Sequence, residues 1–281
     1  MISGDPKLGK SFATCAIIRA VTRGEALPLS SVPNTPGDVI VCNAEDDPED
    51  TFNPRLEQLG ADLERVHYWT GVIDNGQFRT VRFPLDAPSI DQLYEQLKPT
   101  LHIIDPFSAY IDLTVNTWQD AAVRGVIAPI AAAAAKHKVA VVCVRHLVKS
   151  DRASDMYRGQ GSIAFTGAAR SELFFEWPDH HTPRRIIRTI ATNNAEDDEV
   201  TPIAFDLSRE GGFQWVELSE IADVSVAWEM IQEVLNAGAC PVSDLRSQLI
   251  AKGVTESALD TALTNNGVSK LHQGGRWLYS M

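Results

Sequence analysis

The sequence has little of what marks a membrane or secreted protein. Its 281 residues contain no stretch near the roughly 18 uninterrupted apolar residues that a membrane span needs. The start of the chain also lacks the basic segment and apolar segment of a signal peptide. We therefore expect a cytoplasmic protein that does not contact a membrane.

Cysteine and positive charge are also scarce. The cysteines lie far apart without a CxxC pair, so we expect free, buried thiols rather than a metal site or a disulfide framework. They are Cys15, Cys42, Cys143 and Cys240. The net charge of −12 argues against broad, nonspecific adhesion to nucleic acid but leaves room for a local basic groove. Apolar residues make up 44% of the chain, which is ordinary for a globular protein with a core.

Strand-like and helix-like segments alternate over most of the chain. This alternation is typical of an α/β fold, and we expect a mostly parallel central sheet. A final pair of short strands around Gly211-Gly212 indicates a hairpin at one edge of that sheet. The expected strands are 39–42, 101–104, 139–144, 171–177 and 185–191, and the expected helices include 11–22, 89–97 and 117–136.

The composition changes near Val224, which predicts two units, 1–222 and 223–281. The second unit is expected to hold three helices and a hairpin, an order that resembles a winged-helix module. Ser243 and Thr255 are the expected helix N-caps. From Val224 onward there are four basic and five acidic residues, whereas a duplex reader normally carries a positive surface. Binding of DNA, through Arg276 and Trp277, and docking of a protein partner both remain open. The expected elements are helices 226–236, 244–252 and 256–265 and strands 268–272 and 276–279.

One motif decides the class of the first unit. Residues 4–11, GDPKLGKS, match the P-loop pattern G-x-x-x-x-G-K-[ST]. In this pattern backbone N–H groups and the following helix N-terminus bind phosphate, Lys10 reaches the β- and γ-phosphates, and Ser11 ligates Mg²⁺. The residues expected to bind ATP are Gly4, Asp5, Pro6, Lys7, Leu8, Gly9, Lys10, Ser11 and Phe12.

The strand before this motif is short. Only Met1, Ile2 and Ser3 precede Gly4, so we expect a truncated first strand and a sheet that lacks a full core strand. This start favours either a fragment of a longer protein or a misplaced first residue.

Three further side chains follow strand-like runs. Asp105 ends the run 101–104 and is the expected second ligand of Mg²⁺, while Glu45 follows the strand 39–42 and is the expected base that activates water. Asp46 and Asp47 either assist it or form an acidic first turn of the next helix. His146 follows the run 139–144 and is suited to a hydrogen bond with a γ-phosphate. Because the carboxyl ends of parallel strands share one edge, we expect these groups to converge.

The ordered set of motifs resembles a known family. It comprises GDPKLGKS (4–11), NAEDDPED (43–50) with PRL (54–56), IIDP (103–106), RHLVK (145–149), RGQGS (158–162) and GAARS (167–171). This set resembles the RecA-like ATPases of the RepA-type hexameric helicase group, often found beside primases in phages and plasmids. The resemblance covers about residues 1–218.

The resemblance implies a RecA-like core, a ring of identical subunits and ATP bound between them. It implies that Glu45 is the catalytic glutamate and that His146 couples loss of the γ-phosphate to a loop that binds single-stranded DNA. That loop would be 150–166, with Lys149, Arg152 and Arg158 at or in it. Arg170 is the first choice, and Arg158 the second, for an arginine that acts on the neighbouring subunit's ATP.

These implications leave three functions open. The first is a helicase-type ATPase, with a primase or another replication protein as a further partner. The second is a regulatory ATPase that docks a protein partner without moving on DNA. The third is a binding module without turnover. Stimulation of hydrolysis by single-stranded DNA distinguishes the first from the others.

Overall fold

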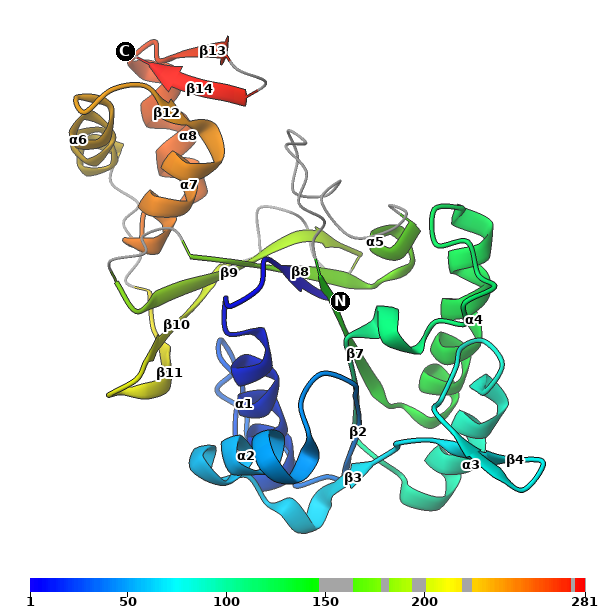
Figure 1. Ribbon diagram of the computed structural model, residues 1–281. Coiled ribbons are helices and arrows are strands. Elements are labelled where there is room, and N and C mark those ends of the chain that lie inside the picture. The colour runs from blue at the N-terminus through cyan, green and yellow to red at the C-terminus, as the bar shows by residue number, and fades with distance from the viewer. Residues whose placement is uncertain (147–163, 178–181, 194–200, 219–223, 274–275, 281) are drawn as a thin grey trace.

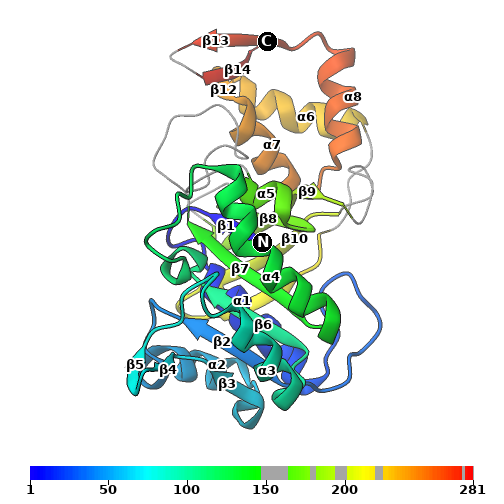
Figure 2. The ribbon, with the colours of Figure 1, turned by 90° about the vertical axis from the view of Figure 1, so that its right-hand side faces the viewer.

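One large sheet organises the first unit. The computed structural model describes residues 1–146, 164–177, 182–193, 201–218, 224–273 and 276–280. Within these residues nine strands form a sheet in the order β11-β10-β9-β8-β1-β7-β6-β2-β3 (Figures 1 and 2). Most of the predicted loop 150–166, with Arg152 and Arg158, and the adjoining Lys149 lie outside the described residues. Its last three residues, Ala164–Thr166, begin a short helix instead.

The strands from β8 to β3 run parallel, as the alternation of strands and helices predicts. They are β1 (Ile2–Gly4), β2 (Val39–Asn43), β3 (Val66–Tyr68), β6 (Leu101–Asp105), β7 (Ala140–His146) and β8 (Ser171–Glu176). Antiparallel strands continue the sheet beyond β8 and include the expected edge hairpin. They are β9 (Arg184–Thr192), β10 (Ile203–Ser208) and β11 (Gly212–Val216). A separate hairpin joins β4 (Val72–Asp74) to β5 (Gln77–Arg79).

The short first strand occupies the centre of the sheet. All three residues of β1 are buried and paired, with Ile2 opposite Val144 on one side and Leu173 on the other. The expectation that the sheet would lack a core strand is therefore wrong, because β1 fills the position between β7 and β8. The strand is short, but its three residues suffice to join β7 to β8 and to place Gly4 at the same level as His146.

Helices cover both faces of the parallel strands, because alternate residues of a buried strand point to opposite faces. Val39 and Val41 of β2 pack with α1 and α2, whereas Ile40 and Cys42 pack with α3 and α4 (Figure 1). The helices are α1 (Lys10–Arg23), α2 (Asn53–Leu59), α3 (Ala87–Leu97), α4 (Asp120–His137) and α5 (Ala164–Ala168), with the single turns η1 (Pro48–Phe52), η2 (Leu63–Arg65) and η3 (Phe107–Tyr110).

The last unit has its own core. Helices α6, α7 and α8 enclose a cluster that includes Ile231, Leu249 and Leu259, all without solvent exposure. Thr255 caps α8 as expected, since its hydroxyl accepts a bond from the Ala258 amide. The cap predicted at Ser243 is wrong, because α7 begins at Val242, two residues before the expected start, and follows Pro241. The elements are α6 (Val224–Leu235), β12 (Cys240–Pro241), α7 (Val242–Ala251), α8 (Glu256–Asn265), β13 (Ser269–Gln273) and β14 (Arg276–Ser280).

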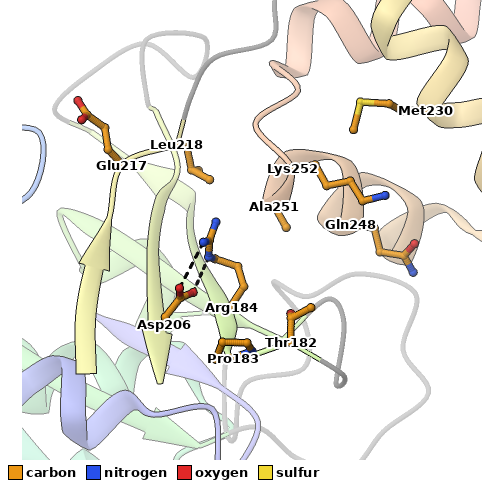
Figure 3. Close-up of a pocket in the computed structure, with 10 residues that line it drawn as sticks. All are labelled: Thr182, Pro183, Arg184, Asp206, Glu217, Leu218, Met230, Gln248, Ala251 and Lys252. Atoms are coloured by element: carbon orange, nitrogen blue, oxygen red, sulfur yellow. Dashed lines mark hydrogen bonds and ion pairs between the residues drawn. The ribbon is translucent and has the colours of Figure 1, made fainter. Parts of the chain in front are cut away.

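The two units meet where α7 contacts β9. Glu176 of β8 accepts hydrogen bonds from Arg188 of β9 (2.7 Å) and from the Ser247 hydroxyl of α7 (2.8 Å). A cavity of about 720 Å³ lies beside this contact, with the Arg184–Asp206 ion pair on the sheet side and Gln248 and Lys252 on the helix side (Figure 3).

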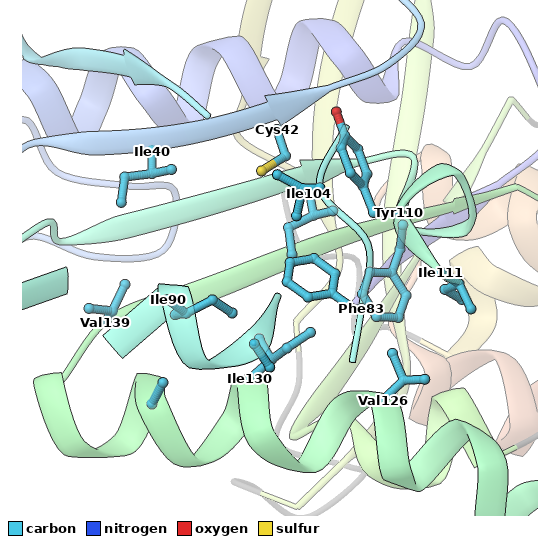
Figure 4. Close-up of a cluster of buried hydrophobic side chains, with 14 of the residues drawn as sticks. Ile40, Cys42, Phe83, Ile90, Ile104, Tyr110, Ile111, Val126, Ile130 and Val139 are labelled. Carbon is cyan, nitrogen blue, oxygen red and sulfur yellow. The ribbon is translucent and has the colours of Figure 1, made fainter. Parts of the chain in front are cut away.

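The largest apolar cluster lies between the sheet and helices α3 and α4. Ile90 of α3 and Val126 and Ile130 of α4 pack against strand residues such as Ile40 and Ile104 (Figure 4). Burial of each such side chain contributes about 1.5–3 kcal/mol. This cluster fixes β2 and β6, the two strands whose carboxyl ends carry Glu45 and Asp105.

Candidate functional site

The P-loop turn forms the floor of the candidate site. Gly4 and Gly9 have φ of 153° and 87°, values that favour glycine. A Cβ on Gly4 would lie 2.9 Å from the Phe175 Cβ, and one on Gly9 would lie 2.8 Å from a methyl of Leu207. The turn ends at α1, whose first-turn N–H groups have no acceptor within the helix and are suited to an anion.

Lys10 is held inside this turn. Its Nζ donates hydrogen bonds to the carbonyl oxygens of Gly4 (2.9 Å) and Asp5 (2.8 Å), and the residue is only 5% exposed. Burial lowers the pKa of Lys10, and the negative charges of Asp105 and Glu45 oppose that shift. The ammonium therefore lies between the P-loop carbonyls and the carboxylates at the strand ends.

The rest of the predicted binding segment surrounds Lys10. Leu8 is buried under the turn, Pro6 and Lys7 are exposed, and Ser11 lies in the first turn of α1. Phe12 follows it, with the Arg55 guanidinium over its ring at 5.2 Å.

Three predicted side chains meet at the carboxyl edge of β2, β6 and β7. Asn43 and Asp105 are register partners at the ends of β2 and β6, and His146 ends β7. The Nε2 of His146 lies 2.9 Å from the Glu45 Oε1. One ligand atom each from Glu45, Asp105 and His146 can be chosen so that all lie within 4.8 Å of one another. The predicted convergence of Glu45, Asp105 and His146 is therefore present.

Asp105 is the buried member of the group. It is 3% exposed, and within the described residues its carboxylate accepts no hydrogen bond. Burial raises the pKa of Asp105 to about 7; the negative charge of Glu45 adds to the rise and Lys10 opposes it. A buried carboxylate without a donor is unfavourable unless a cation compensates it, which fits a divalent ion.

Asn43 turns the chain so that Glu45 reaches this edge. Its side-chain oxygen accepts hydrogen bonds from the backbone N–H groups of Glu45 and Asp46, both at 3.0 Å. Asp47 caps the next turn by accepting from the Glu49 and Asp50 amides, so the acidic-first-turn interpretation holds for Asp47.

Asp46 points to a residue to which the sequence analysis assigned no role. It forms an ion pair with Arg55 of α2, the same guanidinium that lies over Phe12. Arg55 thus joins α2, the P-loop helix and the acidic segment. Arg55 lies twelve residues after the strand-end Asn43 and belongs to the PRL motif (54–56), but nothing local in the sequence predicts this pairing, because it depends on how α2 folds back.

Of the two candidate arginines, only Arg170 lies among the described residues. Arg158 lies outside the described residues. Arg170 is exposed between α5 and β8, and its backbone carbonyl accepts a bond from the Asn193 amide. Glu172, two residues further along, is buried and lies 3.8 Å from Arg145 rather than pairing with Arg170.

Comparison with known proteins agrees with this geometry. A family model described as an AAA domain matches residues 1–152, more than half of the chain. The match covers the P-loop, Glu45, Asp105 and His146, while Arg170 and the last unit lie beyond it. No curated protein matches the chain. Within the described residues, no helix is long and apolar enough to cross a membrane.

Proposed function

The chain belongs to the AAA-domain family of P-loop ATPases, and on that premise we propose that it is an ATP-hydrolysing, RecA-like motor of the replicative helicase type that acts on single-stranded DNA. The observation that carries the proposal is the meeting of the P-loop with Asp105, Glu45 and His146 at the carboxyl edge of the parallel sheet. Ligands of open α/β sheets bind at this edge.

ATP binding uses groups already placed at the turn. The phosphates lie against the first-turn N–H groups of α1, and Lys10 exchanges its bonds to the Gly4 and Asp5 carbonyls for bonds to phosphate oxygens. Mg²⁺ fits Ser11 and the buried, unbonded carboxylate of Asp105, and when bound it offsets the negative charge of the phosphates.

In the proposed hydrolysis, Glu45 is the base that activates the attacking water. The Glu45 side chain is about half exposed (51%), so water reaches its carboxylate. His146 orients this carboxylate through the 2.9 Å contact between its Nε2 and the Glu45 Oε1. Glu45 takes a proton as the water oxygen bonds to the γ-phosphorus, and the bond to the bridging oxygen of ADP breaks.

A neighbouring copy is needed to complete this site. The exposed Arg170 is our first choice for the arginine that stabilises charge on the transferred phosphoryl group of the next subunit in a ring, with Arg158 second. Mixing Arg170→Ala with Glu45→Gln subunits should restore part of the hydrolysis that each variant lacks, because mixed interfaces regain one intact site. Arg209→Ala, another exposed arginine, is the matched control and should retain full activity alone. No recovery at any ratio, with mixing verified, contradicts the arrangement.

The last unit is proposed as a separate winged-helix-like module, residues 223–281. Its three helices and three-stranded sheet agree with that layout. The recognition helix α8 carries Glu256 and Asp260, both paired with Arg246, so its charge favours docking of a protein, such as a primase or another replication protein, in the cytoplasm.

The decisive experiment measures steady-state ATP hydrolysis at low salt with and without single-stranded DNA, on this chain and on a version extended upstream. We expect single-stranded DNA to stimulate ATP hydrolysis several-fold, and we expect Glu45→Gln to show no hydrolysis with or without DNA. Hydrolysis that DNA leaves unchanged contradicts the DNA part of the proposal while retaining the ATPase.

A further inference from the structure

Glu45, Asp105 and His146 have separate roles in the proposed hydrolysis, but together they also form a set of metal-ligand donors. Two carboxylates and one imidazole converge from three neighbouring strands, with ligand atoms within 4.8 Å of one another. The sequence predicted that these groups converge but not that they form a metal site, because 101 positions separate Glu45 from His146 and no local ligand spacing links them.

A second observation points to a cation. Asp105 is 3% exposed, and its carboxylate has no hydrogen-bond donor among the described residues. The nearest ammonium, that of Lys10, is directed to the Gly4 and Asp5 carbonyls. A buried carboxylate in this position gains most from a metal ion that His146 and Glu45 also reach.

The imidazole nitrogen of His146 determines which metal ions this site prefers. Mg²⁺ prefers oxygen ligands and keeps several waters, whereas imidazole nitrogen suits later transition-metal ions such as Co²⁺, Ni²⁺ and Zn²⁺ more strongly. Two carboxylate oxygens with one nitrogen leave open positions for water, as in catalytic rather than structural metal sites.

We propose that Glu45, Asp105 and His146 bind one divalent transition-metal ion in the nucleotide-free chain. Each residue is a direct ligand: Glu45 and Asp105 through one oxygen and His146 through Nε2. The site differs from the Mg²⁺ position on Ser11 and Asp105, since it shares only Asp105 with it. An ion of this class also occupies Glu45 and His146, so it competes with their use in hydrolysis. The proposal shares residues with the proposed function but does not depend on ATP turnover.

The test titrates the tag-free, nucleotide-free chain with Co²⁺ and follows both heat and the visible d–d absorption of the bound ion. We expect one Co²⁺ per chain, displaced by Zn²⁺, with Mg²⁺ at least about tenfold weaker. Asp105→Asn and His146→Gln should each weaken Co²⁺ by about tenfold or more, with far-ultraviolet circular dichroism showing that they fold.

The surface offers a matched control. His137 lies 2.8 Å from Asp91, a His–carboxylate contact of similar length but without a buried third ligand. His137→Gln should leave Co²⁺ binding unchanged. Equal Co²⁺ affinity in His146→Gln and the native chain overturns the proposal, as does a thiolate charge-transfer band, which would assign the ion to cysteine. Failure of the ATPase would leave these results untouched, because no nucleotide is present.

Discussion

At the scale of single residues, His102 shows how burial sets the charge of a side chain. Its Nδ1 lies 2.8 Å from the Tyr94 hydroxyl and its Nε2 3.3 Å from the Cys42 sulfur, with no solvent exposure. Burial lowers the pKa of His102 to about 3. The imidazole is therefore neutral in the fold at every pH where the protein is expected to work.

The pH dependence of stability follows from this shift. Below its ordinary pKa of 6.5 the unfolded chain takes up a proton that folded His102 does not, so stability falls as the pH drops. Between pH 7 and pH 5 the loss is about 2 kcal/mol. His102→Gln should flatten this part of the profile in urea denaturation, measured as the free energy of unfolding.

The matched control for that profile is His272→Gln, at an exposed strand position. It should retain the native slope. A slope between pH 7 and pH 5 that His102→Gln leaves unchanged contradicts the account of His102.

The place of some residues in the site could be predicted from the sequence, and the place of others could not. Lys10, Ser11 and Asp105 lie in short patterns whose geometry is local, so the motif gives their places. Arg55 was not assigned a role, because its contacts with Asp46 and Phe12 arise only when α2 packs on α1. Asn43 carries a recognisable signal, an asparagine that ends a strand before a turn, whose significance is visible once Glu45 is in place.

At the scale of elements, the P-loop turn joins β1 to α1 through backbone conformations that only glycine adopts easily. Gly9→Ala adds a Cβ 2.8 Å from Leu207 and 3.2 Å from the buried Phe205 ring, at a φ of 87°. We expect loss of ATP binding and a fall in unfolding free energy greater than the roughly 1–2 kcal/mol of left-handed strain alone. Thermal melting and titration with a fluorescent ATP analogue check both.

Gly60→Ala separates strain from crowding. Gly60 has a φ of 83°, but a Cβ there meets nothing within 4 Å. This variant should lose only the strain energy and bind ATP normally. Equal effects of the two variants would contradict the close packing at Gly9.

Element boundaries were predictable where the signal is periodic and local. The buried strands and the helices of both units lie close to their expected ranges, because apolar runs and glycine stops act along the chain. The start of α7 was not predictable in this way. Pro241 rather than Ser243 precedes the helix, and the Ser243 hydroxyl donates a hydrogen bond to the Asp244 carboxylate instead of capping it. The single turn η1 before α2 follows from the Asp47 cap and Pro48, whose combined effect no periodicity reveals.

At the scale of the whole molecule, Glu176 joins the ATPase core to the last unit. It accepts from Arg188 within the sheet and from Ser247 of α7, which is 5% exposed. This contact connects residues 71 positions apart and could not be predicted from either segment. It makes the junction a specific, hydrogen-bonded contact rather than an apolar one alone.

A double-mutant cycle measures this junction. Ser247→Ala and Glu176→Gln should each destabilise the chain, and the pair should show a coupling energy of about 1 kcal/mol, since a bond to a charged acceptor is lost only once. Ser257→Ala in the exposed part of α8 is the control and should be additive with Glu176→Gln. Additivity of the Ser247 and Glu176 changes would show that the contact contributes nothing to docking.

The central claim is that the P-loop and the strand-end carboxylates form one site that binds and hydrolyses ATP. The most direct test measures ATP binding and Mg²⁺-dependent hydrolysis in parallel for the native chain, Lys10→Ala and Glu45→Gln. The account predicts that the native chain does both, that Lys10→Ala loses binding, and that Glu45→Gln binds ATP but hydrolyses it at least about a hundredfold more slowly. Native-like hydrolysis in Glu45→Gln, or native-like binding in Lys10→Ala, would contradict it.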